Sequence, residues 1–316
     1  MSDLWKRRGL LLPVNAGHAW WTSHAQAPCV LQVTPRLWRV YFSARNAANR
    51  ASPVAFDVDP GDNMRVLAEY IEPLLEPGAP GSYDHTGVGS ACALWVDGQV
   101  HLYTTGVHLR SDVRFQLSIG LAQSEDGLSF MPAFQGPVRA TGPYDPFFVS
   151  MPCVRASENG YRMWYVSGVG WTSSGTQLEP LYDIRTCYSA DGRIWEQFSQ
   201  CVLSSARLGA SAAGRPWVTQ EGSRLRLWYS LRGAEFRQGG NAAYRIVSQL
   251  LDSEGVASGA PEPVIFSNPP AVGDFDDWMQ AYACIMDYED SQIMLYNGND
   301  FGRAGIGWAT RRRPQT

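Results

Sequence analysis

The sequence predicts an all-β fold, a five-bladed β-propeller with four-stranded antiparallel blades. Three observations support this prediction. A two-part motif recurs five times in phase along the 316 residues. Each copy has the composition of a β-hairpin followed by further strands. An apolar segment near the N-terminus is suited to provide the strand that the last copy lacks.

The repeated motif pairs an apolar residue with a tyrosine eleven or twelve positions later. The first partner is cysteine in four copies and tryptophan in one: Cys29, Cys92, Cys153, Trp217 and Cys284. The second partners are Tyr41, Tyr103, Tyr165, Tyr229 and Tyr296, so the period is 62, 62, 64 and 67 residues. Four strands with a propeller-blade turn pattern need about 40–50 residues, which leaves room for long loops on one face.

Each copy begins with a predicted hairpin. A run rich in Val, Cys and Ala leads into a polar turn, such as VDGQ (96–99) or SENG (157–160), and a β-branched and aromatic run returns. A third strand is clear in residues 117–130 and 183–198, which both contain an Asp-Gly turn. A fourth strand follows, as in QCVLSS (200–205).

The fifth copy ends after its third strand, at residues 304–311, and the N-terminal residues 9–15 are expected to close it. Such closure covers a sheet edge that would otherwise be open to pairing with another chain. We therefore expect a single domain over residues 1–316, with blades at 24–78, 86–140, 146–203, 211–268 and 279–312 plus 9–15.

Composition narrows the class of protein. The net charge of −4 argues against a general nucleic-acid partner. No apolar stretch approaches the ~20 residues that span a bilayer, and no secretory signal is recognisable, so we expect a cytoplasmic protein without a membrane partner. The motif cysteines are expected to be core residues, because the six cysteines form no C-x-x-C. No cofactor or metal is expected.

An anion site in this chain would be built from arginine. Lys6 is the only lysine, and the arginine fork suits carboxylate and phosphate groups. The 12 tryptophans and 14 tyrosines would also serve as platforms for the apolar faces of sugars.

Polar residues that precede the inner strands are expected to converge on one mouth of the central channel. In chain order they are His24, Gln26, Asp84, His85, Thr86, Asp145, Ser150, Ser211, Arg215, Asp276, Asp277, Gln280 and Tyr282. The second strands end nearby, at Arg45, His108, Trp171, Arg232, Asn297, Asn299 and Asp300. A loop over residues 169–183 would cover this pocket and bring Trp171 and Tyr182 to a sugar.

Several segments resemble the five-bladed glycosidase superfamily, which includes arabinanases, β-xylosidases, invertases, levansucrases and mannoside phosphorylases. The segments are YFSARN, IGLAQSEDGLSF, RMWYVSG, GRPWV and LYNGNDFG. The resemblance covers nearly the whole chain at the level of the repeat and extends to uncharacterised bacterial members. It implies a carbohydrate or sugar-phosphate ligand and chemistry at a glycosidic bond.

The superfamily's hydrolases use an Asp on the first inner strand and a Glu on a later one, because one group protonates the leaving oxygen while the other activates water or attacks carbon. This sequence departs from that pattern, with His24 and Gln26 at the first position and no Glu at the fourth. The phosphorylase members manage with one protein acid, since phosphate is the nucleophile. We therefore expect glycosyl cleavage or transfer with Asp84 as the acid, and His24 and Asp145 as further catalytic candidates.

The expected substrate contacts are Gln26, Arg45, His85, Trp171, Tyr182, Arg215, Arg232, Asp276, Asp277, Tyr282 and Asn299. For each arginine the alternative is a structural role, as an inter-blade salt bridge or as a clamp on strand carbonyls. For Asp145, which precedes Pro146, the alternative is a role as a turn residue. Two other functions remain open: a sugar-binding propeller that has lost its acids, and a lyase or isomerase on the same scaffold. A metal site from His24, His85 and His108 is the weakest alternative.

Overall fold

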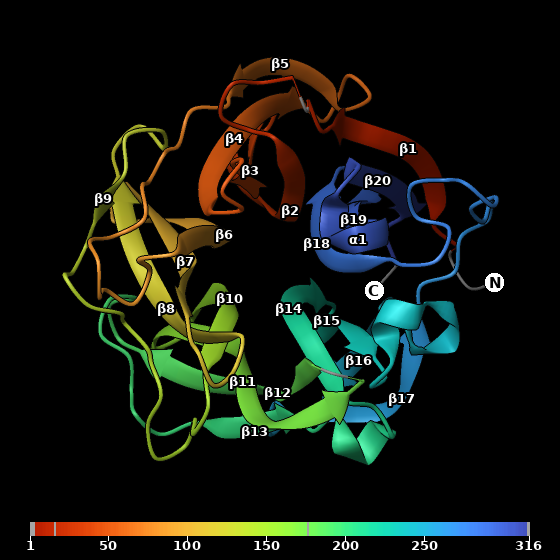
Figure 1. Cartoon of the computed structure of the whole chain (residues 1–316). Helices are drawn as coiled ribbons and strands as arrows, with labels where there is room; N and C mark the ends of the chain where they lie inside the picture. The colour runs from red at the N-terminus through yellow and green to blue at the C-terminus, as the bar shows by residue number, and fades with distance from the viewer. Residues whose placement is uncertain (1–3, 16, 176, 315–316) are drawn as a thin grey trace.

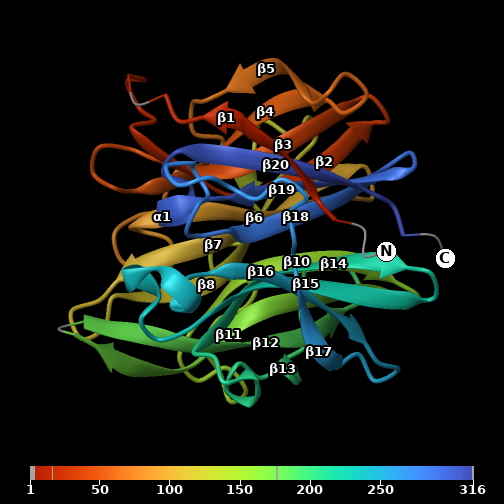
Figure 2. The same cartoon turned by 90° about the vertical axis from the view of Figure 1, so that its right-hand side faces the viewer.

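The computed structural model describes residues 4–15, 17–175 and 177–314. Its strands form five blades around a central axis (Figure 1). Inner strands of successive blades contact one another around the ring, and the two termini lie near each other beside the last blade (Figure 2). The predicted all-β, five-bladed propeller is confirmed.

Each blade has four antiparallel strands, named in order from the axis outwards. Blade I has β2 (Ser23–Thr34), β3 (Leu37–Arg45), β4 (Ala51–Asp59) and β5 (Arg65–Tyr70). Blade II has β6 (Gly87–Val96), β7 (Gln99–Leu109), β8 (Phe115–Ser124) and β9 (Met131–Pro132). Blade III has β10 (Val149–Ser157), β11 (Gly160–Ser174), β12 (Gln177–Ser189) and β13 (Gln200–Leu203).

Blade IV has β14 (Ala212–Glu221), β15 (Arg224–Arg232), β16 (Arg245–Leu251) and β17 (Ala257–Pro263). Blade V has β18 (Ala281–Tyr288), β19 (Ser291–Asn297), β20 (Gly305–Arg312) and β1 (Lys6–Pro13). The N-terminal strand β1 pairs antiparallel with β20, as the sequence predicts, although it begins three residues earlier than expected. Short helical turns lie between strands: η1 (Ala206–Leu208), η2 (Phe236–Gln238), η3 (Gly240–Ala242) and α1 (Asn299–Gly302).

A bulge in the inner strands explains the spacing of the repeated motif. In four blades the residue two positions before the motif residue has a positive φ: Ala27 (54°), Met151 (48°), Arg215 (52°) and Tyr282 (61°). In blade II the spacing is one residue shorter, and the irregularity in the pairing is limited to one residue, Ala91, between Ser90 and Cys92. Because a bulge re-aims the side chain it carries, these positions turn toward the axis rather than into the blade.

Polar side chains on the second strands bind the backbone of the neighbouring blade at this same level. Four inner-strand N–H groups donate across blades: Ala27 to Asn297 Oδ1 (2.7 Å), Ser90 to Ser43 Oγ (3.1 Å), Met151 to Thr105 Oγ1 (2.9 Å) and Tyr282 to Ser230 Oγ (2.8 Å). Each acceptor lies one or two residues after a repeat tyrosine. The repeat therefore encodes contacts between blades as well as the strands themselves.

The repeat tyrosines are core residues, each at most 1% exposed. Tyr41 donates to the carbonyl of Gly127 (2.8 Å), and Tyr103 donates to that of Gly192. Both acceptors belong to Asp-Gly turns of the next blade, so a buried polar group is satisfied where two blades meet.

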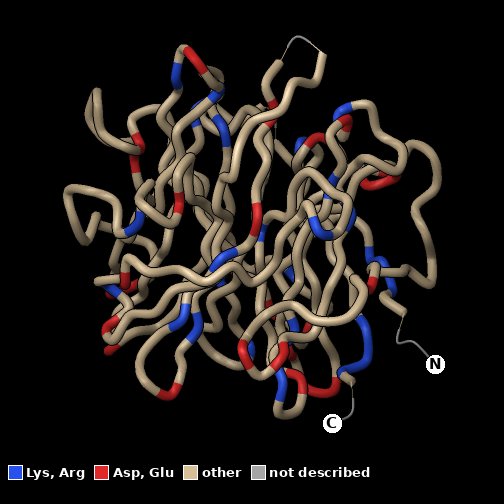
Figure 3. Tube along the Cα trace, turned by 90° about the horizontal axis from the view of Figure 1, so that it is seen from below, with Lys and Arg blue, Asp and Glu red and all other residues tan. Residues whose placement is uncertain are grey.

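Charges of both signs are interspersed along the chain (Figure 3). Across residues 4–15, 17–175 and 177–314 there is no helix with the length and apolar character of a membrane span.

Candidate active-site cavity

A cavity of about 800 Å³ lies at the axis, lined by residues of all five blades. The polar part of its wall comes mainly from the starts of inner strands and the ends of second strands, which is where the repeat predicts a site. Its charged lining residues are Arg45, Arg50, Arg114, Glu179, Arg232, Arg237, Asp300 and Arg303. Six cations and two carboxylates leave a formal surplus of four positive charges.

Nine of the residues singled out in the sequence line this cavity: His24, Gln26, Arg45, Thr86, Ser150, Tyr182, Arg232, Tyr282 and Asp300. They come from all five blades. The bulge at Tyr282 directs its ring to the cavity wall, where it stacks on Phe301 with ring centroids 6.3 Å apart.

Arg45 lies at the end of β3, and all its side-chain partners within the described residues are neutral. Its Nη2 donates to Gln26 Oε1 at 2.7 Å and its Nη1 to Asn49 Oδ1 at 3.1 Å. Burial lowers the pKa of Arg45 from its usual value. A half-buried guanidinium with no carboxylate partner is poised to pair with an anion from outside the protein.

His24 stands beside Arg45 with a left-handed backbone, at φ 57°. Burial, followed by the charges of Arg45 and Arg303, lowers its pKa to about 4. Its Nδ1 lies 3.0 Å from Ser23 Oγ. His24 is therefore neutral near pH 7 and adds nothing to the positive charge of the cavity.

Arg232, at the end of β15, is only 2% exposed and is also bound by neutral groups. Its Nε donates to Tyr244 Oη at 3.1 Å, its Nη2 to the Pro180 carbonyl at 2.5 Å and its Nη1 to the Gly233 carbonyl at 3.2 Å. The guanidinium carbon lies 4.2 Å from the ring centroid of Phe236. Tyr244 in turn is hydrogen-bonded to the hydroxyl of Tyr182.

Glu179 is a cavity carboxylate that the sequence analysis missed. It is 2% exposed and pairs with Arg237 (Nε to Oε1, 2.7 Å) and Arg114 (Nη1 to Oε1, 3.3 Å). These three residues come from blades III, IV and II, so Glu179 ties three blades together at the cavity wall. Its oxygens are committed to arginines, and its clearest role is to position them.

The loop that the sequence predicts over residues 169–183, which gives Glu179 no place in the repeat, is wrong. Most of the segment is paired as the ends of β11 and β12, with Trp171 opposite Pro180 and Thr172 opposite Glu179; Thr176 lies outside the described residues. The expected sugar platform Trp171 does not line the cavity. Its ring packs behind the wall, 5.4 Å from that of Phe115 and 5.9 Å from that of Phe148.

Asp300 is the second cavity carboxylate. It is exposed and lies in α1, where Asp300 and Phe301 have successive positive φ angles of 53° and 60°. In the part of the chain that the structure describes, no hydrogen bond or ion pair holds its side chain. Non-glycine residues in this conformation are costly and gather at functional sites, and Asp300 is the cavity carboxylate that remains free to react.

Asp84 and His85 do not reach the cavity. Asp84 Oδ1 accepts a hydrogen bond from Ser82 Oγ at 2.7 Å within the turn before β6. The same side chain packs over Gly106 of β7, where an added Cβ would lie 2.9 Å from Asp84 Cβ. The ring of His85 lies 5.9 Å from that of His108. Asp84 therefore caps its own loop, and His85 is its neighbour in that loop. Neither position supports Asp84 as the acid of this cavity.

Asp145 is a buried structural carboxylate on blade III, not a cavity residue. It is 2% exposed, accepts from Arg139 Nη2 at 2.5 Å and from the hydroxyl of Tyr165 at 3.0 Å, and lies 3.9 Å from Arg185. These contacts give it a structural role as the buried partner of an arginine and a tyrosine.

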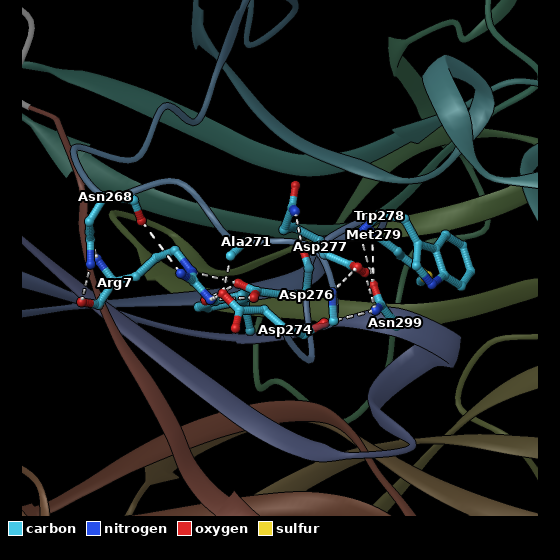
Figure 4. Close-up of polar contacts among 12 residues, drawn as sticks. Arg7, Asn268, Ala271, Asp274, Asp276, Asp277, Trp278, Met279 and Asn299 are labelled. Carbon is cyan, nitrogen blue, oxygen red and sulfur yellow. Dashed lines mark hydrogen bonds and ion pairs between the residues drawn. The ribbon is translucent and has the colours of Figure 1, made fainter.

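Asp276 on blade V is, like Asp145, a buried carboxylate that pairs with an arginine (Figure 4). It is fully buried, pairs with Arg7 at 2.5 Å and 2.9 Å, and accepts from the hydroxyl of Tyr296 at 2.6 Å. Because Tyr165 and Tyr296 are equivalent in the repeat, the two carboxylates hold corresponding tyrosines. Asp276 therefore fastens the N-terminal strand to blade V and does not line the cavity.

Asp277 and Asn299 brace the loop that carries them. Asp277 accepts from the Gly273 N–H at 2.8 Å and from Asn299 Nδ2 at 2.6 Å, and these bonds lower the pKa of Asp277. Asn299 Oδ1 also accepts from two backbone N–H groups, of Trp278 and Met279. Neither residue lines the cavity.

Arg215 lies deep in the axis, fully buried, and does not line the cavity. It donates to the carbonyls of Ala91 (2.6 Å) and Pro28 (2.7 Å), on the inner strands of blades II and I. The alternative of a clamp on strand carbonyls is therefore the one realised in this fold. The motif cysteines surround the same region and are buried and free; burial raises the pKa of Cys29 to about 12.

The described residues hold no group of three or more His, Cys, Asp or Glu side chains placed to bind a metal ion. The charged cavity residues that the sequence did not reveal, apart from Glu179, are arginines in connections: Arg50, Arg114, Arg237 and Arg303. Only their position in the chain could have indicated these arginines, because each lies within a few residues of the end of a second strand or the start of a third strand.

No known protein-family model matches the chain. The uncharacterised protein Rv1502 of Mycobacterium tuberculosis (strain ATCC 25618 / H37Rv) is 32% identical over 312 residues, which make up 96% of this chain and 98% of the relative. Among solved structures, a BT0996 complex with RGII matches with a TM-score of 0.70 and 13% identity, over 98% of this chain and 92% of its own. A structure from the GH130 family of mannoside phosphorylases, reported to contain glycoside hydrolases that target β-1,2 mannosidic linkages in Candida mannan, matches with a TM-score of 0.67 and 12% identity, over 98% of this chain and 93% of its own.

Proposed function

This chain belongs to the family of the uncharacterised mycobacterial protein Rv1502, and we propose that it is a carbohydrate-active enzyme that cleaves or transfers the glycosyl bond of an anionic sugar in the central cavity. The single observation that carries the proposal is the set of cavity arginines without a carboxylate partner. Arg45 and Arg232 have neutral partners only, and the guanidinium groups of Arg50 and Arg303 have no hydrogen bond or ion pair within the described residues. The propeller fold shared with solved glycoside hydrolases supports the carbohydrate part of the proposal.

The charge of the ligand follows from electrostatics. Unpaired cations in a partly enclosed cavity attract anions and hold them by charge-assisted hydrogen bonds. Arginine presents two parallel N–H donors, which match a carboxylate or a phosphate. A uronic acid, a sugar phosphate, or a neutral sugar together with inorganic phosphate would each bring negative charge to these arginines.

The aromatic wall accounts for the sugar. Phe115, Phe148, Phe236, Tyr282 and Phe301 line the cavity, and the guanidinium groups of Arg232 and Arg237 lie over the ring of Phe236. Their faces can cover the apolar C–H surface of a pyranose ring while polar groups bind its hydroxyls.

Asp300 is assigned the role of general base. As the cavity carboxylate without a protein partner, it is free to accept a proton from water as the water attacks the anomeric carbon. With inorganic phosphate as the nucleophile this step is not needed, because phosphate already carries negative charge.

A second candidate, a sugar-binding propeller without catalysis, is favoured by one observation. Of the two cavity carboxylates, Glu179 is occupied by Arg114 and Arg237, so only Asp300 is free among the described residues, whereas glycosidases of the usual type need two.

A rate screen separates these functions. Aryl glycosides of glucuronic acid, galacturonic acid, glucose and mannose are tested with and without inorganic phosphate, on the wild type, on Asp300→Asn and on the control Asp62→Asn. Asp62 is an exposed carboxylate that pairs with Arg65 far from the cavity. We expect aryl release from an acidic glycoside, or from a neutral one only with phosphate, with a loss of about 100-fold or more in Asp300→Asn when water is the nucleophile. Binding of these sugars without release by any variant would favour the second candidate.

A further inference from the structure

The reaction proposed above also needs a group that protonates the leaving oxygen, and the cavity wall offers a tyrosine in place of a second free carboxylate. Tyr182 lies where blades III and IV pair directly, with Tyr182 of β12 opposite Ala212 of β14. It lines the cavity and is hydrogen-bonded to Tyr244, which also lines it.

The direction of the hydrogen bonds among Arg232, Tyr244 and Tyr182 follows from which of their atoms can donate. A guanidinium only donates, so the oxygen of Tyr244 accepts from Arg232 Nε at 3.1 Å. Tyr244 is 3% exposed, and within the described residues Tyr182 is the partner that remains for its proton. A buried hydroxyl proton without an acceptor is costly. Tyr244 therefore donates to Tyr182, and the proton of Tyr182 is left to point into the cavity.

From this chain of donors, Arg232 to Tyr244 to Tyr182, we infer that Tyr182 is the proton donor to the leaving oxygen; the inference rests on the proposed function. As the bond between the anomeric carbon and the leaving oxygen breaks, the bonding electrons pass to that oxygen, and the proton of Tyr182 Oη joins it. Water adds to the anomeric carbon and loses its proton to Asp300. That proton returns to Tyr182 through solvent in the open cavity, so the cycle closes.

The surroundings suit this role. Tyr182 becomes a phenolate when it gives up its proton, and the hydroxyl of Tyr244 and the charge of Arg232 stabilise the new negative charge. Burial, together with the neighbouring Tyr182, raises the pKa of Tyr244 well above its usual value, so Tyr244 keeps its proton and remains a donor. The guanidinium carbon of Arg232 also lies 5.2 Å from the ring centroid of Tyr182.

A neutral acid fits an anionic substrate better than a second carboxylate would. A carboxyl group at this place would have to keep its proton beside the arginines, whose positive charges favour the ionised carboxylate. Tyr182 is the catalytic residue in this scheme, while Tyr244 and Arg232 are positioning residues that orient its proton and stabilise its phenolate.

The test is a leaving-group series on Tyr182→Phe, with Tyr188→Phe as the matched control. Tyr188 lies on the same strand, is 41% exposed and does not line the cavity. Phenyl and 2,4-dinitrophenyl glycosides of the sugar that the wild type turns over are compared. A phenyl group needs protonation to leave and a dinitrophenyl group does not. We expect Tyr182→Phe to lower kcat on the phenyl glycoside by about 100-fold, to leave the dinitrophenyl glycoside nearly unchanged and to leave KM unchanged on both. Tyr244→Phe should show the same selective loss to a smaller degree.

Equal losses on the two leaving groups, or no loss on either, would overturn the role of Tyr182 and leave the proposed function in place. The absence of any turnover by the wild type would instead contradict the proposed function, and the role of Tyr182 would fall with it. Melting temperatures of all variants show whether a loss reflects misfolding, which the removal of one hydroxyl oxygen is not expected to cause.

Discussion

Two carboxylates of the last blade, Asp276 and Asp300, have opposite environments. Asp276 is fully buried and held by Arg7 and Tyr296, whereas Asp300 is exposed at the cavity with no partner in the described part of the chain. The same contrast separates two arginines of blade IV: Arg215 clamps strand carbonyls in the axis, and Arg232 faces the cavity. The difference shows that a charged residue is structural when its partners hold it away from the cavity, and available for chemistry when it lines the cavity wall.

The largest effect on stability is expected from Asp276→Asn. The substitution leaves Arg7 without its buried partner, and breaking such a pair costs about 3–5 kcal/mol. Asp274→Asn is the matched control, because Asp274 binds the same Arg7 at 3.1 Å but has a side chain 41% exposed, and it should cost under about 1 kcal/mol. Urea unfolding of both variants measures the difference. Equal costs for the two would contradict the structural role given to Asp276.

A loss of affinity without a loss of stability is expected from Arg303→Gln. Arg303 is exposed and has no partner to lose within the described residues, so its removal should change the free energy of unfolding by less than about 0.5 kcal/mol. A charge-assisted hydrogen bond contributes about 1.5–3 kcal/mol, so glucuronate binding should weaken by about tenfold or more. Calorimetric titration gives the affinity, and unchanged binding would remove Arg303 from the anion site.

A smaller, pH-dependent effect is expected from His24→Asn. The folded-state pKa of His24 is lowered to about 4 from 6.5, so the unfolded chain binds more protons between these values, and this group's contribution to stability is lost as pH falls through them. After allowance for solvent screening the loss is about 1–2 kcal/mol. Asn cannot titrate and tolerates the positive φ of residue 24. Unfolding at pH 7 and pH 4 should show a smaller drop in the variant; equal drops would contradict the lowered pKa.

The smallest effect is expected from Asp84→Asn. Its carboxylate caps a turn and packs over Gly106, outside the cavity wall. Turnover of any glycoside by this variant should stay close to that of the wild type, while Asp300→Asn should lose most of it. A deeper loss in Asp84→Asn than in Asp300→Asn would restore the assignment made from the sequence.

The fold could be predicted from the sequence because short local patterns mark each copy of the repeat. The tyrosine period, the polar turns and the apolar N-terminal strand are each visible within a few residues. The bulge at Ala27, Met151, Arg215 and Tyr282 is visible too, as a spacing of twelve rather than eleven.

The site could be predicted only in part, because partners are set by the three-dimensional structure. Strand register placed His24, Gln26, Arg45, Arg232 and Tyr282 at the cavity. Register cannot show that Asp276 is paired with Arg7, 269 positions away. Arg303 and Glu179 belong to connections and strand extensions outside the repeat, so the pattern gives them no position.

The most direct test of the central proposal, that unpaired cavity arginines bind an anionic carbohydrate, is a calorimetric comparison of glucuronate with glucose. It uses the wild type, Arg303→Gln and the control Arg224→Gln, whose arginine is exposed at the start of β15 and does not line the cavity. We expect the wild type and the control to bind glucuronate more tightly than glucose, by about tenfold or more, with a preference that weakens as salt is added and that Arg303→Gln reduces. Equal affinities for the two sugars, or a preference that Arg303→Gln leaves intact, would contradict it.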